Sequence, residues 1–314
     1  MKLSAFTTLS PLFGAGVRVR NALYDRGVLT SHKLQGPVIS VGNLSVGGSG
    51  KTPFIILLGE LLKARGIKFD VLSRGYGRRT RGVFVVDPSG LAQDFGDEPM
   101  LIAQRLQVPV VVGEDRYRAG IAAEEKFGPQ LHLLDDGFQH RALARDFDIV
   151  LVTPEDGRDH LLPTGRLREP LNNLKRADAI VLMNGASQDA FPITGKLVWQ
   201  VRRGIEPIQV LPRPVAFCGI ARPQNFFAQL RTAGIEPIAE AVYQDHHSYT
   251  ESDIQELLQV RQQSEAGGYV TTEKDLINLG RHRSSLEPLV AIPVKMKLLD
   301  ATNVMDTIVQ RIKG

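Results

Sequence analysis

The stretch ISVGNLSVGGSGKTPF, residues 39–54, decides the fold class of this 314-residue chain. A short apolar run leads into closely spaced glycines, and a helix-compatible run that includes Lys51 and Thr52 follows. In such a turn, successive backbone N–H groups and the N-terminus of the next helix together form a phosphate site. The order strand, glycine loop, helix therefore predicts a nucleotide-binding loop.

The loop departs from the usual pattern at one position. That pattern begins with a glycine where this chain has Ser45. Gly47 and Gly48 lie two residues further on, and we expect them to provide the turn. The alternative is a glycine-rich turn that contains Lys-Thr by chance. The predicted nucleotide-binding residues are Ser45, Val46, Gly47, Gly48, Ser49, Gly50, Lys51 and Thr52.

Short apolar runs continue to alternate with helix-like segments along the chain. The expected strands are 37–42, 68–73, 108–113, 131–135, 147–152 and 178–183, and the helix-like segments are 53–65, 98–107 and 115–127. This alternation predicts an α/β fold of the P-loop NTPase type, with a doubly wound, mostly parallel sheet. Ligands of such sheets bind beyond the carboxyl ends of the strands.

The alternation of apolar runs and helix-like segments changes after residue 190. We expect the chain to divide into four segments. We expect an amphipathic, membrane-associating helix over residues 1–30 and a nucleotide-binding domain over 31–195. Prolines break residues 196–214 into extended pieces, which we interpret as a two-stranded hinge. Residues 215–314 are expected to form a smaller α/β domain.

The N-terminal helix is expected to start at Ser10, as the cap, with Pro11 in the first turn. Apolar residues then recur on one face, while arginines lie elsewhere, as in helices that rest in a membrane interface. The run from Leu3 to Val17 is shorter than the roughly 20 apolar residues that a spanning helix needs. A helix packed on the domain core is the alternative.

Composition excludes several function classes. The 38 Lys and Arg residues exceed the 34 Asp and Glu residues by only four, which gives no reason to expect a nucleic-acid partner. Cys218 is the only cysteine, so an internal disulfide and a zinc site of paired cysteines are both excluded. A reducing cytoplasmic compartment fits this usage, and no feature points to a protein partner.

Several carboxylates are candidates for chemistry. Asp135 and Asp136 end the strand in LHLLDDGFQH and are candidates, with Thr52, for a magnesium site, although Asp-Asp-Gly is also ordinary turn chemistry. Asp97 in GDEP is suited either to capping a helix or to accepting a proton from a hydroxyl. His246 and His247 lie beside Asp245 in QDHHSYT and are candidates to orient such an acid, with a solvated turn as the alternative.

Three basic loops follow strands, SRGYGRRTRG at 73–82, EDRYRAG at 114–120 and GRLREP at 165–170. Because these loops are expected at the same sheet edge, they can together neutralise the charge of ATP and of an anionic acceptor.

In their order along the chain, these motifs resemble the tetraacyldisaccharide 4′-kinase family of lipid A biosynthesis. The matching pieces are GNLSVGGSGKTP, SRGYGR, GDEP, GEDR, LLDDGFQH, GRLREP, DHHSYT and TTEKD. The resemblance implies transfer of the ATP γ-phosphoryl group to the 4′-hydroxyl of a tetraacylated disaccharide 1-phosphate, which forms lipid IVA. It also implies a peripheral enzyme at the cytoplasmic face of a Gram-negative inner membrane.

The resemblance also implies roles for particular residues. Lys51 is expected to bind ATP and act in catalysis, and Thr52, Asp135 and Asp136 are expected to hold Mg²⁺. Asp97 is the expected general base, assisted by a histidine, which is His246 in our assignment, although the residues alone leave His247 open. The expected substrate contacts are Tyr76, Arg116, Gln139, His140 and Arg168.

Two other functions compete with this one. A nucleotide-driven switch or metallochaperone also suits the GGSGKT loop, although the chain has no Asn-Lys-x-Asp signature for guanine. A kinase for a soluble sugar would leave the N-terminal helix as packed core. Phosphorylation of an acylated disaccharide lipid would distinguish the 4′-kinase function from both of these alternatives.

Overall fold

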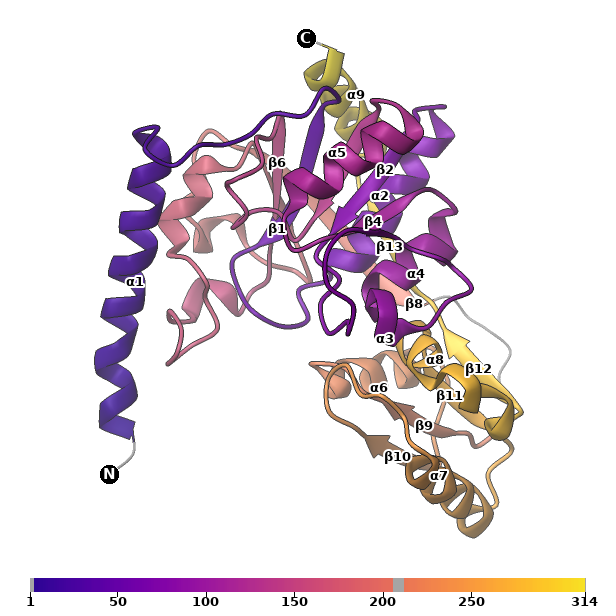
Figure 1. The fold of residues 1–314 in the computed structure, drawn as a ribbon. Helices are drawn as coiled ribbons and strands as arrows, with labels where there is room; N and C mark the ends of the chain where they lie inside the picture. Colours follow the sequence, from indigo (N-terminus) through magenta and orange to yellow (C-terminus); the bar gives the residue numbers. More distant parts are fainter. Residues whose placement is uncertain (1–2, 206–211, 314) are drawn as a thin grey trace.

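The computed structural model describes residues 3–205 and 212–313, which form two β-sheets with flanking helices (Figure 1). The large sheet has the strand order β13-β8-β7-β6-β1-β5-β2-β4-β3. Its strands are β1 (Val38–Asn43), β2 (Phe69–Ser73), β3 (Phe84–Val85), β4 (Val110–Val112), β5 (Leu131–Asp135), β6 (Phe147–Val152), β7 (Ala179–Leu182), β8 (Leu197–Ile205) and β13 (Val294–Leu298). All six strands expected before residue 190 are present.

The large sheet is parallel except at its two edges, where β3 pairs antiparallel with β4 and β13 pairs antiparallel with β8. Helices cover both faces. On one face α2 (Lys51–Ala64), α4 (Asp97–Leu106) and α9 (Ala301–Lys313) bury apolar side chains in one core. On the other face α5 (Arg116–Phe127) buries Ala119 and Ala123 in a second core. This is the predicted doubly wound arrangement of the P-loop NTPase type.

The second sheet is smaller and fully parallel, in the order β10-β9-β11-β12. Its strands are β9 (Val215–Cys218), β10 (Ala239–Val242), β11 (Tyr269–Thr272) and β12 (Leu289–Ile292). The helices around it are α6 (Pro223–Thr232), α7 (Glu251–Ser264) and α8 (Glu273–Leu279). Short elements elsewhere are α3 (Ala92–Phe95) and the 3₁₀ helices η1 (Asp156–Arg158), η2 (Leu171–Arg176), η3 (Gln188–Ala190) and η4 (Gly280–Leu286).

The last twenty residues differ from the expected domain division. Sequence patterns assigned them to the smaller domain, but β13 pairs with β8 from Val294–Ile205 to Leu298–Val201. Helix α9 then buries Val304 in the core of the large sheet, and Figure 1 shows α9 on the side away from the second sheet. Within the segment expected to form a two-stranded hinge, 196–214, the described strand is β8, which pairs with β7 and β13. Residues 197–205 pair with a strand far along the chain, and 206–211 lie outside the described residues.

The N-terminal helix α1 (Leu3–Asp25) begins earlier than expected and contains Pro11. Ser10 does not cap it, and its hydroxyl donates to the carbonyl oxygen of Leu161 at 3.0 Å. Figure 1 shows α1 extending away from the sheets, with its first residues at the free end. Across the described residues, no helix has both the length and the apolar character that crossing a membrane requires.

Candidate functional site

A cleft of about 480 Å³ opens between the two sheets, at the carboxyl end of the large one. The phosphate loop and the residues after β5 form one wall. The start of α6, the loop that carries His246 and the start of α8 form the opposite wall. The cleft therefore lies where ligands of doubly wound sheets bind, and the second sheet covers it.

The phosphate loop has the conformation that binds anions. Gly47 has φ of 82° and Gly50 has φ of 84°, a region that side chains with a Cβ disfavour. Helix α2 begins directly after, at Lys51, so its N-terminus points into the cleft. The second sheet approaches closely here, since a Cβ on Gly48 would lie 3.6 Å from Cγ of Arg222.

Ser45 replaces the first glycine without strain because no turn is made there. The residue is buried and forms a β-bridge with Leu167, and Val46 N–H donates to the Arg166 carbonyl at 2.8 Å. Gly47 is thus the first residue of the loop with a positive φ, and Ser45 does not need the conformational freedom of a glycine.

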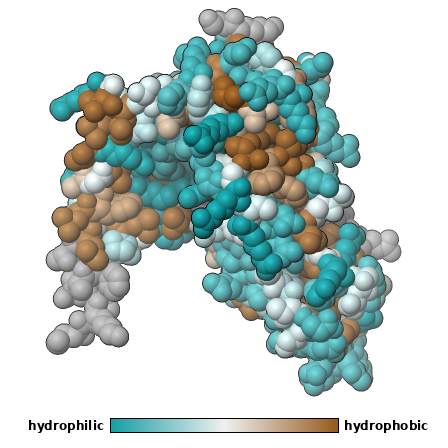
Figure 2. Space-filling view, in the orientation of Figure 1, coloured by the Kyte–Doolittle hydropathy of each residue, from teal (hydrophilic) through white to brown (hydrophobic). Residues whose placement is uncertain are grey.

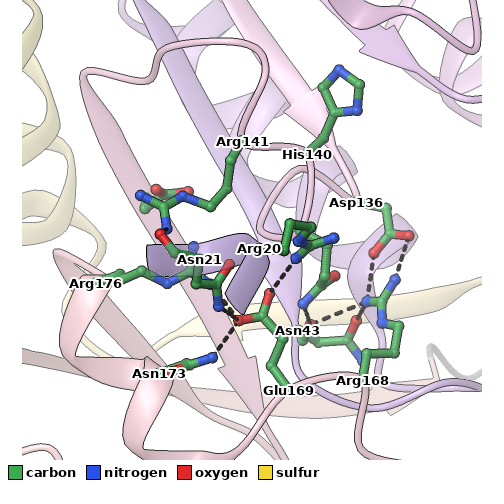
Figure 3. A network of polar contacts seen from close by, with 12 residues as sticks. Arg20, Asn21, Asn43, Asp136, His140, Arg141, Arg168, Glu169, Asn173 and Arg176 are labelled. Carbon is green, nitrogen blue, oxygen red and sulfur yellow. Dashed lines mark hydrogen bonds and ion pairs between the residues drawn. The ribbon is translucent and has the colours of Figure 1, made fainter. Parts of the chain in front are cut away.

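Figure 3 shows the polar contacts by which Arg168 links Asn43, the last residue of β1, to Asp136, the residue after β5. Arg168 donates two hydrogen bonds of 2.8 Å to the carboxylate of Asp136 and one of 2.5 Å to Oδ1 of Asn43. Lys51 Nζ donates to the same Asn43 oxygen at 3.0 Å and lies 3.5 Å from Asp136. Burial raises the pKa of Asp136, but Lys51 and Arg168 outweigh it and hold the pKa far below its usual range. Asp136 is therefore a fixed anion.

Asp135 has a different environment. Its Oδ2 accepts from the Ser73 hydroxyl at 3.0 Å, while its buried Oδ1 has no partner among the described residues. Burial and the negative charges of Glu98 and Asp136 raise the pKa of Asp135 to about 7. A buried carboxylate oxygen without a partner is suited to a cation or to the water around one.

Magnesium usually takes one or two protein carboxylates and completes its shell with phosphate oxygens and water. Asp135 and the Thr52 hydroxyl both line the cleft, so they fit such a site. Asp136, the other carboxylate expected to bind the metal, instead forms ion pairs with Arg168 and Lys51. The described residues contain no cluster of three or more His, Cys, Asp or Glu that could hold a metal by themselves.

Asp97 and His246 meet across the two sheets. Nδ1 of His246 lies 2.9 and 3.0 Å from the two carboxylate oxygens of Asp97, and Asn278 donates to Asp97 at 3.2 Å. Asp97 is only 5% exposed and is the first residue of α4, with Gly96 as the cap. His246 itself lines the cleft. The carboxylate therefore lies behind the imidazole as seen from the cleft.

The same contacts set the charge of the pair. Burial raises the pKa of Asp97, but the hydrogen bond from His246 and the charge of Lys274 outweigh it, so the pKa lies below its usual value. Burial lowers the pKa of His246, but the hydrogen bond and charge of Asp97 outweigh it and raise that pKa. His247 faces elsewhere, with Nε2 3.0 Å from Asp253.

The residues expected to contact substrate divide into two groups. Tyr76 and Arg168 line the cleft, and the Tyr76 ring lies 5.1 Å from the His246 ring. Arg116, Gln139 and His140 are not in its wall, yet each has a buried side-chain nitrogen or oxygen that finds no partner in the described part of the chain. Burial and the charge of Arg116 lower the pKa of His140 to about 4, so this imidazole is neutral.

Several residues of the site have no signal in the sequence. Asn43 ends β1 like many strand-end asparagines, yet it joins Lys51 to Arg168. Arg203 and Arg222 enter the cleft wall from β8 and from the start of α6. Lys274 was visible only as part of TTEKD, and no local pattern brings it to Asp97, 177 positions earlier in the chain.

A phosphate loop, a strand-end carboxylate with one oxygen that has no partner among the described residues, and a histidine backed by a buried aspartate meet at one cleft, and together they define a P-loop phosphotransferase. A family model described as Tetraacyldisaccharide-1-P 4′-kinase matches residues 3–313, so the chain belongs to this family.

Individual relatives agree with the family assignment. The chain is 51% identical to the tetraacyldisaccharide 4′-kinase of Koribacter versatilis, over 97% of this chain and 98% of that one. It is 39% identical to the enzyme of the same name from Aquifex aeolicus, over 95% of each chain. A crystal structure of LpxK from Aquifex aeolicus in complex with ATP is similar in fold, with a TM-score of 0.83, 36% identity and coverage of 99% of this chain and 100% of that one.

Proposed function

We propose that this protein transfers the γ-phosphoryl group of ATP to the 4′-hydroxyl of tetraacyldisaccharide 1-phosphate and so forms lipid IVA. The observation that carries the proposal is one cleft with the phosphate loop on one wall and the imidazole of His246 on the other. The family membership supplies the acceptor, and the related structure in complex with ATP supports the donor.

The nucleotide phosphates bind along residues 45–52 in this proposal, with the backbone N–H groups of the loop and the start of α2 as donors. Lys51 and Arg168 add positive charge where the β- and γ-phosphates lie. Thr52 and Asp135, which line the cleft, would hold Mg²⁺, and the ion would neutralise part of the charge of the phosphates. Asp136 acts by holding Lys51 and Arg168 in place.

Proton transfer is assigned to the His246–Asp97 pair. The sequence pointed to Asp97 as the base and His246 as its assistant, but the burial of Asp97 behind the ring favours the opposite division. The 4′-hydroxyl gives its proton to Nε2 of His246, while Asp97 orients the ring through Nδ1 and stabilises the imidazolium that forms. Tyr76 lies beside the ring and forms part of the acceptor side.

The second sheet contributes His246 and closes the cleft, so we propose that it acts as the smaller of two domains. Closure over bound nucleotide excludes water, which would otherwise compete with the sugar hydroxyl for the phosphoryl group.

We also propose that α1 brings the protein to the cytoplasmic face of the inner membrane. Leu12 is 68% exposed and Val19 is 59% exposed, and Figure 2 shows hydrophobic residues along this helix. A helix such as α1, with exposed apolar residues and two arginines, lowers its free energy at an anionic membrane surface. In vesicle flotation, the double variant Leu12→Ser with Val19→Ser should float less than the unchanged protein.

One assay tests the proposed reaction. The purified protein is incubated with MgATP and detergent-dispersed tetraacyldisaccharide 1-phosphate, and mass spectrometry detects a second phosphate on the lipid. His246→Gln and Asp97→Asn should lower kcat roughly 10²- to 10⁴-fold, because each removes part of the proton acceptor. Both should keep most of their affinity for ATP. Absence of the bis-phosphorylated lipid under conditions where ATP binds, or equal turnover of a soluble sugar, would contradict the proposal.

A further inference from the structure

Lys274, the second residue of α8, lines the cleft and contacts both His246 and Asp97. Its ammonium nitrogen is 3.3 Å from Nε2 of His246 and 3.3 Å from Asp245. It is also 3.5 Å from Asp97 and 3.9 Å from Glu98. The side chain is only 16% exposed, so the charge is held within this cluster.

The contact with Nε2 defines the tautomer of His246. An ammonium group has three N–H donors and no acceptor, so Nε2 must accept and is therefore unprotonated. The ring proton then lies on Nδ1, which faces the carboxylate of Asp97. This is the tautomer that a general base requires, with the lone pair on Nε2, the ring nitrogen that does not face Asp97.

The charge of Lys274 acts in the same direction as this hydrogen bond. A positive charge beside an imidazole disfavours the second proton, whereas Asp97 and Asp245 favour it. The charged groups that face His246 are Asp97 from α4, Lys274 from α8 and Asp245 from its own loop, with the phenol ring of Tyr76 on the remaining side. Burial lowers the pKa of Lys274, but Asp97, Glu98 and Asp245 outweigh it, so the ammonium stays charged.

We propose that Lys274 is a positioning residue for His246, which keeps Nε2 unprotonated until the acceptor hydroxyl arrives. This inference rests on the proposed function. The hydroxyl must take the place of the ammonium at Nε2. Lys274 can give up that contact because three carboxylates lie within 4 Å of its nitrogen. The lysine thereby links acceptor binding to release of the base.

A neighbouring ion pair provides a matched control. Glu273, the residue before Lys274, accepts a hydrogen bond of 2.5 Å from Arg105 of α4, which lies on the large sheet. This contact also joins α8 to α4, and it does not reach His246. Arg105→Gln therefore weakens the docking of the two elements and leaves the imidazole unchanged.

The experiment compares the unchanged protein with Lys274→Met, Lys274→Arg and Arg105→Gln. The pH dependence of kcat/KM is measured with MgATP and the detergent-dispersed lipid. Separately, the pKa of His246 is measured by NMR of histidine labelled with ¹³C at Cε1, assigned with His246→Gln. In Lys274→Met, the loss of the neighbouring charge should raise the pKa of His246 by about one pH unit or more. The acid limb of the kcat/KM profile, where activity falls as the pH is lowered, should move to higher pH by the same amount. Activity should then fall about tenfold near pH 6.5 and recover toward pH 9.

Lys274→Arg keeps the charge and should keep the acid limb, while Arg105→Gln should lower activity by the same factor at every pH. A uniform loss in Lys274→Met with an unchanged pKa of His246 would overturn the inference and leave Lys274 with a structural role. If the unchanged protein makes no phosphorylated lipid, the proposed function fails. The NMR titration then still decides whether Lys274 controls His246.

Discussion

Arg168 and Asp136 illustrate, at the scale of single residues, how the site depends on geometry as well as charge. The guanidinium makes two parallel hydrogen bonds of 2.8 Å to the carboxylate and reaches Asn43 with the same group. Hydrogen bonds to charged groups contribute roughly 1.5 to 3 kcal/mol each. A lysine has the charge but cannot reproduce the planar fork.

Arg168→Lys should therefore lower kcat/KM for MgATP roughly 10- to 100-fold, measured in steady-state kinetics with the lipid acceptor. Arg166→Lys is the matched control, because Arg166 lies on the same segment and pairs with Asp159 instead of Asp136. Equal losses in both variants would show that the segment responds to any change and that the fork has no special role.

At the scale of elements, a buried charged network fastens α5 to the sheet. His132 of β5 lies between Asp70 of β2 at 2.8 Å and Glu124 of α5 at 3.3 Å. Glu124 also accepts from the N–H of Gly36 at 2.7 Å. Burial lowers the pKa of His132, but the hydrogen bond and charge of Asp70, with those of Glu124, outweigh it and raise the pKa.

This raised pKa makes the contribution of His132 to stability depend on pH. Because the pKa is higher in the folded chain than the unfolded value of about 6.5, the contribution is fully present below that pH. It is lost as the pH rises through the folded pKa. His132→Gln should therefore cost about 3 kcal/mol near pH 5.5 in urea unfolding, and less at pH 9. A cost that grows with pH would contradict the sign of the shift.

Another buried carboxylate holds α1. Glu169 is fully buried and accepts from Asn21 of α1 at 3.0 Å, from Asn173 at 2.6 Å and from Arg176 at 2.7 Å, as Figure 3 shows. Its neighbour in sequence, Arg168, points to Asp136 and Asn43 instead. One short segment thus supports both the helix and the phosphate loop.

Glu169→Gln removes the charge opposite Arg176 and should destabilise the docking of α1 by about 3 kcal/mol, since it leaves a buried cation unpaired. Hydrogen exchange of the amides in residues 9–25 should become faster. Asp25→Asn is the control, because Asp25 pairs with Arg141 at an exposed position, where an ion pair contributes less than about 1 kcal/mol. Unchanged exchange in Glu169→Gln would mean that apolar contacts alone hold the helix.

At the scale of the whole molecule, the cleft belongs to two sheets, so a ligand in it must stabilise both. MgATP at about 100 times its dissociation constant should add about 2.7 kcal/mol to the free energy of unfolding. Hydrogen exchange should slow at residues 45–52 and also at 220–226 and 272–276. Lys51→Ala should reduce both effects together. Protection confined to the phosphate loop would show that the second sheet does not engage the nucleotide.

The sequence by itself determined the class of the fold and the nucleotide side of the site. Alternation of apolar runs and the spacing of glycines act locally, so β1, the phosphate loop and α2 could be predicted from residues 37–65 alone. Asp135 and Asp136 were predictable because parallel strands all end at one edge. The motif order then indicated the family.

Only the tertiary structure decided what depends on contacts between distant segments. Helix α1 starts at Leu3, although Pro11 predicted a later start. Strand β13 pairs with β8 of the large sheet, which lies about 90 positions earlier in the chain. The same is true of the pair formed by Asp97 and His246, and of Lys274 beside it. Local propensity carries no information on such pairings, because they are set by contacts between segments that lie far apart in the sequence.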